Sequence, residues 1–200
     1  MPELALALYL LFLVIAFGWR SFVQYRRTGD LGFRFSRSAS ALERGTGASF
    51  AIALVALALL PLAGMAGLVS PLAALDRPAG YGLGLLFAGL GIATTLVAQL
   101  QMGSSWRIGV DASEVTALVQ HGLFRYVRNP IFSGMLFATL GFALLVPSVF
   151  SAAVWLVLAL TIELQVRRVE EPYLLRTHGE RYRDYARKVG RFLPRVGLLA

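Results

Sequence analysis

The stretch ELQVRRVEEPYLL, which begins at Glu163, places acids and bases at one end of a long apolar run. On an α-helix Glu163, Arg167 and Glu171 recur every four residues and share one face, with Glu170 beside it. Ionisable groups at membrane depth are costly and usually line a cavity or a pathway, so this spacing favours a pocket with both charge signs. Pro172 removes a helical hydrogen bond and predicts a kink just after the two glutamates. A solvated ladder of charges is the simpler interpretation of the same residues.

A second stretch, HGLFRYVRNPIFSG, begins at His121 and joins two apolar regions. Asn129 is a favoured helix N-cap and Pro130 suits the first turn, so we expect a helix to begin there. The unpaired backbone N–H groups and the positive dipole end of such a helix attract a carboxylate or a phosphate, and Arg128 would add a positive side chain. The structural alternative is that these residues cap a membrane helix while the arginines meet lipid phosphates.

A third stretch, from Gln101 to Phe124, has strand-like and turn-like character. It carries Trp106 and Arg107 where the chain leaves an apolar run, a pairing most often found as an anchor at the membrane interface. By itself this stretch predicts no particular chemistry.

Composition assigns the chain to the membrane class. Of its 200 residues 57% are hydrophobic and 15% are charged, whereas a soluble domain carries about a quarter charged residues. The absence of cysteine excludes disulfides, thiol catalysis and cysteine metal sites, and with only two histidines we expect no metal centre. The net charge of +8 indicates topology and contact with anionic lipid headgroups rather than nucleic-acid binding.

Five apolar segments are expected to cross the bilayer as helices, so the predicted fold is an all-α integral membrane protein. Residues 130–165 are too long for one span, and Pro147 divides them into a tight helical hairpin. Beyond them, apolar and aromatic side chains recur every three or four residues and predict an amphipathic helix at the cytoplasmic surface. The other spans are residues 3–19, 48–69 and 81–102, and the side chains of the amphipathic helix are Leu174, Leu175, His178, Tyr182 and Tyr185.

The distribution of basic residues favours one orientation. All but Arg77 of the 19 lysines and arginines fall in residues 20–47, 103–129 or 166–200, which five spans place on one side. The positive-inside rule makes that side cytoplasmic, so we expect the N-terminus outside and the C-terminus and active site inside.

Four short motifs follow one another in the second half of the chain: LVQHGLFRYVRNPIF, RRVEE, HGERYRDY and RFLP. Their order and spacing resemble those of the isoprenylcysteine carboxyl methyltransferase and phospholipid methyltransferase superfamily, over roughly residues 101–195. Members of that superfamily are integral membrane enzymes that use S-adenosylmethionine. The resemblance implies a methyltransferase core in residues 103–200, preceded in 1–102 by three membrane helices and a basic loop, and a bacterial-type inner or plasma membrane as the location.

The resemblance also implies site residues. Arg167 would hold the substrate, and Arg167 and Glu171 would act in catalysis. The cofactor's carboxylate would suit Arg128 and the first turn of the helix at Pro130, its ammonium or ribose the two glutamates, and its adenine the aromatic and apolar residues. The residues implied for cofactor binding are Thr116, Ala117, Leu118, Val119, Phe124, Arg128, Asn129, Pro130, Ile131, Phe132, Glu170 and Glu171.

The chain departs from the commonest superfamily pattern at four positions. Asn129 stands where histidine is commonest, Phe124 and Phe132 where tyrosine is usual, and His178 where phenylalanine is usual. Roles that use backbone groups or stacking are compatible with these residues.

The predicted function is methyl transfer from S-adenosylmethionine to an amphiphilic acceptor, such as an isoprenylcysteine-like carboxylate, that enters from the bilayer. The methyl carbon is already activated by the sulfonium, so positioning and desolvation dominate such a reaction. A phospholipid amine or a small thiol or phenol remains open as the acceptor. Two other classes also remain open: a non-enzymatic scaffold whose basic tail binds anionic lipids, and an NADPH-dependent membrane reductase.

Overall fold

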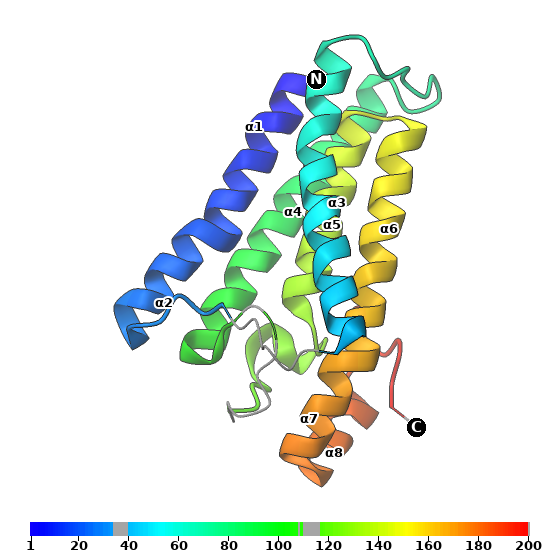
Figure 1. Cartoon of the computed structure of the whole chain (residues 1–200). Coiled ribbons are helices and arrows are strands. Elements are labelled where there is room, and N and C mark those ends of the chain that lie inside the picture. Colours follow the sequence, from blue (N-terminus) through cyan, green and yellow to red (C-terminus); the bar gives the residue numbers. More distant parts are fainter. Residues whose placement is uncertain (34–39, 108, 110–116, 200) are drawn as a thin grey trace.

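The protein is a bundle of long apolar helices, shown in Figure 1. The computed structural model describes residues 1–33, 40–107, 109 and 117–199. Within these ranges the regular elements are helices. An isolated parallel β-bridge joins Val127 to Gly190. The predicted all-α class is therefore confirmed for the part of the chain that the structure describes.

The first helix is longer than the predicted span. Helix α1 (Pro2–Leu13) continues through a π-helical turn (Val14–Trp19) into α2 (Arg20–Thr28). The sequence predicted a loop from residue 20, but α2 is amphipathic and buries Arg20, Ser21 and Gln24 against the bundle. The next helices are α3 (Ala41–Met65), which Ser40 and Glu43 cap reciprocally, and α4 (Pro78–Met102), which ends in a 3-10 turn (Gly103–Ser105).

The second half contains the predicted hairpin. Helix α5 (Pro130–Leu145) turns at Pro147 into α6 (Val149–Gln165), where the Ser148 side chain accepts a hydrogen bond from the Ser151 N–H. Helix α6 continues through a π-helical turn (Val166–Glu170) into α7 (Glu171–His178). The predicted amphipathic helix is present as two helices, α7 and α8 (Glu180–Lys188), which are separated at Gly179, where φ is 54°.

Four of the described helices are long and apolar enough to cross a membrane. They are Pro2–Thr28, Ala41–Met65, Pro78–Ser105 and Val149–His178. Helix α5 is equally apolar but has 16 residues, slightly fewer than a full span needs. The protein is an integral membrane protein, and its shorter apolar helix, α5, is packed inside the bundle.

Glycines let α4 and α5 approach each other closely along their length. A Cβ added to Gly91 would lie 2.1 Å from the backbone nitrogen of Ala138, and one added to Gly141 would lie 2.3 Å from that of Ala88. Gly134 faces α4 in the same way. This glycine seam, formed by Gly91, Gly134 and Gly141, fixes α5 against α4 and so determines where the first turn of α5 lies.

The two ends of the bundle differ in character (Figure 1). Helices α2, α7 and α8 lie at one end, and the N-terminus lies at the other with the α3–α4 and α5–α6 connections. The basic regions that were predicted to share one side of the membrane therefore share one end of the molecule, as far as the structure describes them.

Candidate functional site

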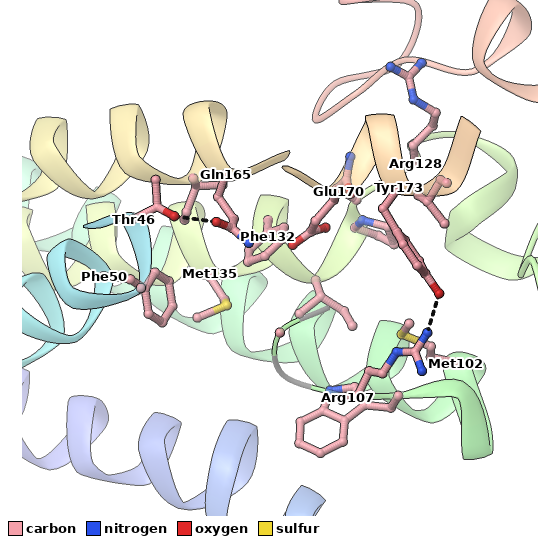
Figure 2. A pocket seen from close by; sticks show the side chains of 18 of the residues that line it. Thr46, Phe50, Met102, Arg107, Arg128, Phe132, Met135, Gln165, Glu170 and Tyr173 are labelled. Carbon is pink, nitrogen blue, oxygen red and sulfur yellow. Dashed lines mark hydrogen bonds between the residues drawn. The ribbon is translucent and has the colours of Figure 1, made fainter. Parts of the chain in front are cut away.

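A cavity of about 770 Å³ lies where the first half of the chain meets α5, α6 and the tail helices. This volume is within the range of about 300–1,000 Å³ typical of small-molecule sites. Figure 2 shows polar side chains such as Arg107, Glu170 and Tyr173 toward one end, and Phe50 and Met135 toward the other. Other lining residues include Phe17, Thr46, Leu54, Gln99, Trp106, Ile162, Gln165, Leu174, Tyr182 and Tyr185.

The first turn of α5 forms one wall of the cavity. Asn129, Pro130, Ile131 and Phe132 all line it, and the helix begins at Pro130 as the sequence predicted. The N–H groups of Ile131 and Phe132 belong to the first turn, where a helix offers no internal acceptor. They are therefore two backbone donors at the cavity wall, next to the positive end of the helix dipole.

Asn129 does not cap the helix with its side chain. Its backbone N–H and its side-chain Nδ2 both donate to the Arg191 carbonyl, over 3.1 and 3.2 Å. The Ser133 hydroxyl donates in the same way to the Phe192 carbonyl over 2.7 Å. The C-terminal segment thus holds the start of α5 in place, a contact between residues about 60 positions apart that local sequence patterns do not reveal.

Glu171 lies in a buried ion-pair network rather than in the cavity lining. Its Oε1 accepts from Arg128 over 2.6 Å and from the Arg191 Nε over 2.7 Å, and its Oε2 accepts from the Arg191 Nη2 over 2.9 Å. All three residues are more than nine-tenths buried. The hydrogen bond and the charge of Glu171 raise the pKa of Arg191, so this guanidinium stays protonated.

Arg128 lines the cavity, but it is largely committed to the protein. Its Nη1 donates to the carbonyls of Ala186 and Val189, and its Nη2 donates to Glu171 and to the carbonyl of Gly197. The predicted contact with a cofactor carboxylate would have to use donor capacity of Arg128 that these hydrogen bonds do not already occupy. The side chain instead ties α7, α8 and the C-terminal segment to the start of α5.

Both glutamates were expected at the cofactor site, but of the two only Glu170 lines the cavity. It is a lining residue, and no described residue forms an ion pair with it. The π-helical turn that ends at Glu170 is wider than a turn of α-helix. The side chains that follow it are therefore rotated out of the i, i+4, i+8 register. The ladder predicted from Glu163 through Arg167 to Glu171 is for that reason interrupted before Glu171.

Arg167 points away from the cavity. Its side chain is 59% exposed, and it pairs with Glu163 over 3.5 Å. Among the described residues that line the cavity Arg167 does not occur. The geometry therefore gives no support to contact between Arg167 and an acceptor in this cavity. Arg191 reaches the same Glu163 carboxylate from the buried side, over 3.1 Å.

The residues implied for an adenine-binding wall are largely brought together. Ala117, Leu118, Val119 and Phe124 line the cavity, although residues 117–120 form no strand. Thr116 lies outside the described residues. The Phe124 carbonyl accepts a hydrogen bond from the buried Tyr185 hydroxyl, and burial raises the pKa of Tyr185 and of Tyr182, so both phenols stay neutral.

Sequence reasoning missed several residues of the site. Arg191 belongs to the RFLP motif, which had been noted without a role. The lining residues Phe17, Thr46 and Phe50 come from the first half of the chain, which the resemblance did not cover. Among the described residues no group of three or more histidines, aspartates or glutamates could hold a metal ion.

The fold and cavity define an integral membrane protein with a pocket that is lined by both polar and apolar side chains. The model of the phospholipid methyltransferase family matches residues 79–181, which is more than half of the chain. The chain belongs to the phospholipid methyltransferase family.

A solved structure supports the fold assignment. The chain is similar to the eukaryotic intramembrane Ras methyltransferase, isoprenylcysteine carboxyl methyltransferase, with a TM-score of 0.63 and 21% sequence identity. The similarity covers 95% of this chain and 64% of that one, so this chain spans less than two thirds of that protein's length. At this level of identity the likeness concerns the fold. No curated protein matches the chain.

Proposed function

We propose that the protein transfers a methyl group from S-adenosylmethionine to an amphiphilic acceptor at the cytoplasmic face of the membrane. The observation that carries the proposal is one cavity with two kinds of wall. Arg107 and Glu170 lie toward its polar end, and Phe50 and Met135 toward its apolar end (Figure 2). Such a cavity suits a charged cofactor and a lipophilic acceptor side by side.

The polar end matches the chemical groups of the proposed cofactor. The N–H groups of Ile131 and Phe132 suit its carboxylate, and the Glu170 carboxylate, with which no described residue forms an ion pair, suits its ammonium or its ribose. Leu118, Phe124 and Phe132 offer apolar and aromatic surface to an adenine. When bound, the cofactor would supply a methyl group already activated by its sulfonium.

The apolar end suits a lipid-like acceptor. Phe17, Phe50, Leu54, Met135 and Ile162 belong to helices that pack within the membrane part of the bundle. An acceptor tail among these side chains would be in contact with helices that face the bilayer, so entry from the lipid phase is the natural route. The protein would act by positioning the two reactants and excluding water.

The acceptor atom stays open within this proposal. The family takes its name from phospholipid methylation, and the structural neighbour is named for methylation of an isoprenylcysteine carboxyl group. A carboxylate, a phospholipid amine, a small thiol and a phenol are all compatible with the cavity. The cytoplasmic orientation rests on the basic residues gathered at the cavity end of the bundle.

A calorimetric titration in detergent tests the cofactor directly. We expect S-adenosylhomocysteine to bind and NADPH not to bind. We expect Glu170→Gln to weaken this binding about tenfold, as loss of a charged hydrogen bond does, whereas Glu180→Gln on the exposed face of α8 should leave it unchanged. Binding of NADPH alone would indicate a reductase, and binding of neither compound would favour a non-enzymatic membrane protein.

A further inference from the structure

Arg20 is a buried cation for which the described part of the chain offers no acidic partner. It lies at the start of α2, toward the cavity end of the bundle, and is 1% exposed. No described acidic residue forms a salt bridge with it. A buried charge without a counter-ion is strongly unfavourable, so this position needs an explanation beyond packing.

Its guanidinium is held in place, but only partly satisfied. The Nη2 donates to the Gly103 carbonyl and to the Gln24 Oε1, and the guanidinium carbon lies 4.6 Å from the ring centroid of Trp106. The Nε and Nη1 are buried and have no hydrogen-bond partner among the described residues. A group oriented by stacking and by two hydrogen bonds thus keeps unmet donors.

Two neighbouring polar groups are unmet as well. The Ser21 hydroxyl and the Gln99 Oε1 are buried, and the part of the chain that the structure describes gives neither of them a hydrogen-bond partner. Gln99 donates its Nε2 to the Ala16 carbonyl over 2.8 Å. It therefore joins α4 to the first helix one helical turn before Arg20. Unmet donors and acceptors gathered at one place indicate a missing polar occupant rather than a local packing fault.

The cluster adjoins the cavity. Phe17, Gln99 and Trp106 line the cavity. Phe17 lies within a turn of Arg20, Trp106 stacks on its guanidinium, and Gln99 binds the Ala16 carbonyl one turn before it. The Trp106 ring both covers the guanidinium and forms part of the cavity wall. A rotation of this ring would therefore open the guanidinium to the cavity.

We propose that Arg20, with Ser21 and the stacked Trp106, is the subsite that receives the carboxylate or phosphate of the acceptor. This inference rests on the proposed function and names the acceptor class, an anionic amphiphile. The other arginines near the site are less suited. Arg128 and Arg191 share the Glu171 carboxylate, and Arg167 is exposed and paired with Glu163. The selecting residue thus comes from outside residues 79–181, the part that the family model matches.

Thermal unfolding in a neutral maltoside detergent tests the subsite, with dodecyl phosphate as the probe. We expect dodecyl phosphate to raise the unfolding temperature of the wild-type protein, and dodecanol, which has the same chain without the charge, to need at least about tenfold more. Inorganic phosphate should have little effect, because the subsite is reached through the apolar cavity. A wild-type protein that responds equally to dodecyl phosphate and dodecanol would overturn the proposal.

Two variants locate the effect. In Arg20→Met about tenfold more dodecyl phosphate should be needed for the same rise in unfolding temperature. Arg20→Lys, which keeps the charge, should retain most of the wild-type response. The matched control is Arg26→Met, which removes the same charge from an exposed position of the same helix and should respond like wild type. An unchanged response in Arg20→Met contradicts the proposal, and should that variant fail to fold, the comparison with dodecanol decides.

Cofactor binding separates this inference from the proposed function. Arg20→Met should still bind S-adenosylhomocysteine, because Glu170 and the first turn of α5 are unchanged. If wild-type protein failed to bind S-adenosylhomocysteine but still preferred dodecyl phosphate through Arg20, the methyl-transfer proposal would fall and the anion subsite would stand.

Discussion

Glu170 and Glu171 are adjacent in the sequence but differ in every contact that the structure describes. Glu171 holds two arginines together in the interior, whereas Glu170 lines the cavity and forms no ion pair with a described residue. The first is expected to matter for stability and the second for binding. Substitution of each by glutamine separates the two roles.

Glu171→Gln should destabilise the protein strongly. The amide leaves Arg128 and Arg191 buried without their counter-ion, a loss of about 3–5 kcal/mol in comparable buried pairs. Thermal unfolding in detergent should show a large fall in the midpoint. Glu180→Gln, which breaks only the exposed pair with Arg183, is the control and should barely shift it. A small effect of Glu171→Gln would mean that the network contributes little.

Tyr185→Phe should destabilise the protein by about 1 kcal/mol. The variant keeps the ring in the aromatic cluster with Tyr182 but leaves the Phe124 carbonyl without the buried hydroxyl donor. Chemical denaturation would measure the difference. Tyr126→Phe is the matched control, since Tyr126 is 61% exposed, and equal values for the two variants would argue against a role for the buried bond.

At the residue scale the sequence predicted the residues that line the cavity best where short local motifs indicate them. Phe124, the run from Asn129 to Phe132 and Glu170 line the cavity as expected. Arg167 does not, because the predicted ladder assumes an unbroken α-helix and the structure has a π-helical turn there. Nor could spacing reveal that Arg191, 20 residues further along, would bind the Glu171 carboxylate.

Helices α4 and α5 show how an element places the site without contributing its chemistry. The glycine seam brings the two backbones so close that a single methyl group would meet main-chain atoms. Because the first turn of α5 forms a cavity wall, the position of this seam decides where the wall lies.

Gly91→Ala should destabilise the protein by about 1–3 kcal/mol, as overpacking does. The added Cβ would lie 2.1 Å from the Ala138 nitrogen, so α4 and α5 would have to move apart. The matched control is Gly89→Ala on the same helix, where no atom lies within 4 Å of the added Cβ. That change should be neutral or slightly stabilising, because alanine favours the helix. Thermal unfolding of the two variants side by side distinguishes the effect of packing at the glycine seam from the effect of helix propensity.

At the element scale the sequence predicted the hairpin around Pro147 and the start of α5, because proline and N-cap residues are local signals. It did not predict that the first helix continues to Thr28. Polar residues after Trp19 indicated a loop, but tertiary packing buries them on one face of α2. The division between α7 and α8 likewise depends on Gly179, which has a positive φ. The periodicity of apolar residues does not predict this backbone conformation.

For the whole molecule the basic residues predict an orientation in the membrane. Reporter fusions after Asp76 and at Ala200 should report opposite sides, with the C-terminal reporter in the cytoplasm, because nearly all of the described arginines lie at the cavity end. Two reporters on the same side would overturn the arrangement of five crossings, and reversed signals would place the cavity outside.

At this largest scale the sequence predicted the class of protein but only half of the cavity. Hydropathy alone indicates membrane helices, whereas the contribution of Phe17, Thr46 and Phe50 arises from packing between helices far apart in the chain. Apolar helices in a bilayer have many compatible neighbours, so their pairing is not encoded in any single segment.

The C-terminal segment has a consequence for biosynthesis. The carbonyls of Gly190, Arg191 and Phe192 accept hydrogen bonds from Arg128, Asn129 and Ser133, so the wall at the start of α5 is completed by residues that leave the ribosome after every membrane helix. During translation Arg128 would leave the ribosome well before Arg191, whose carbonyl accepts a hydrogen bond at the start of α5. A nascent chain interrupted before Gly190 would thus carry all its apolar helices and an unfinished pocket, which is the kind of product that membrane quality control must recognise.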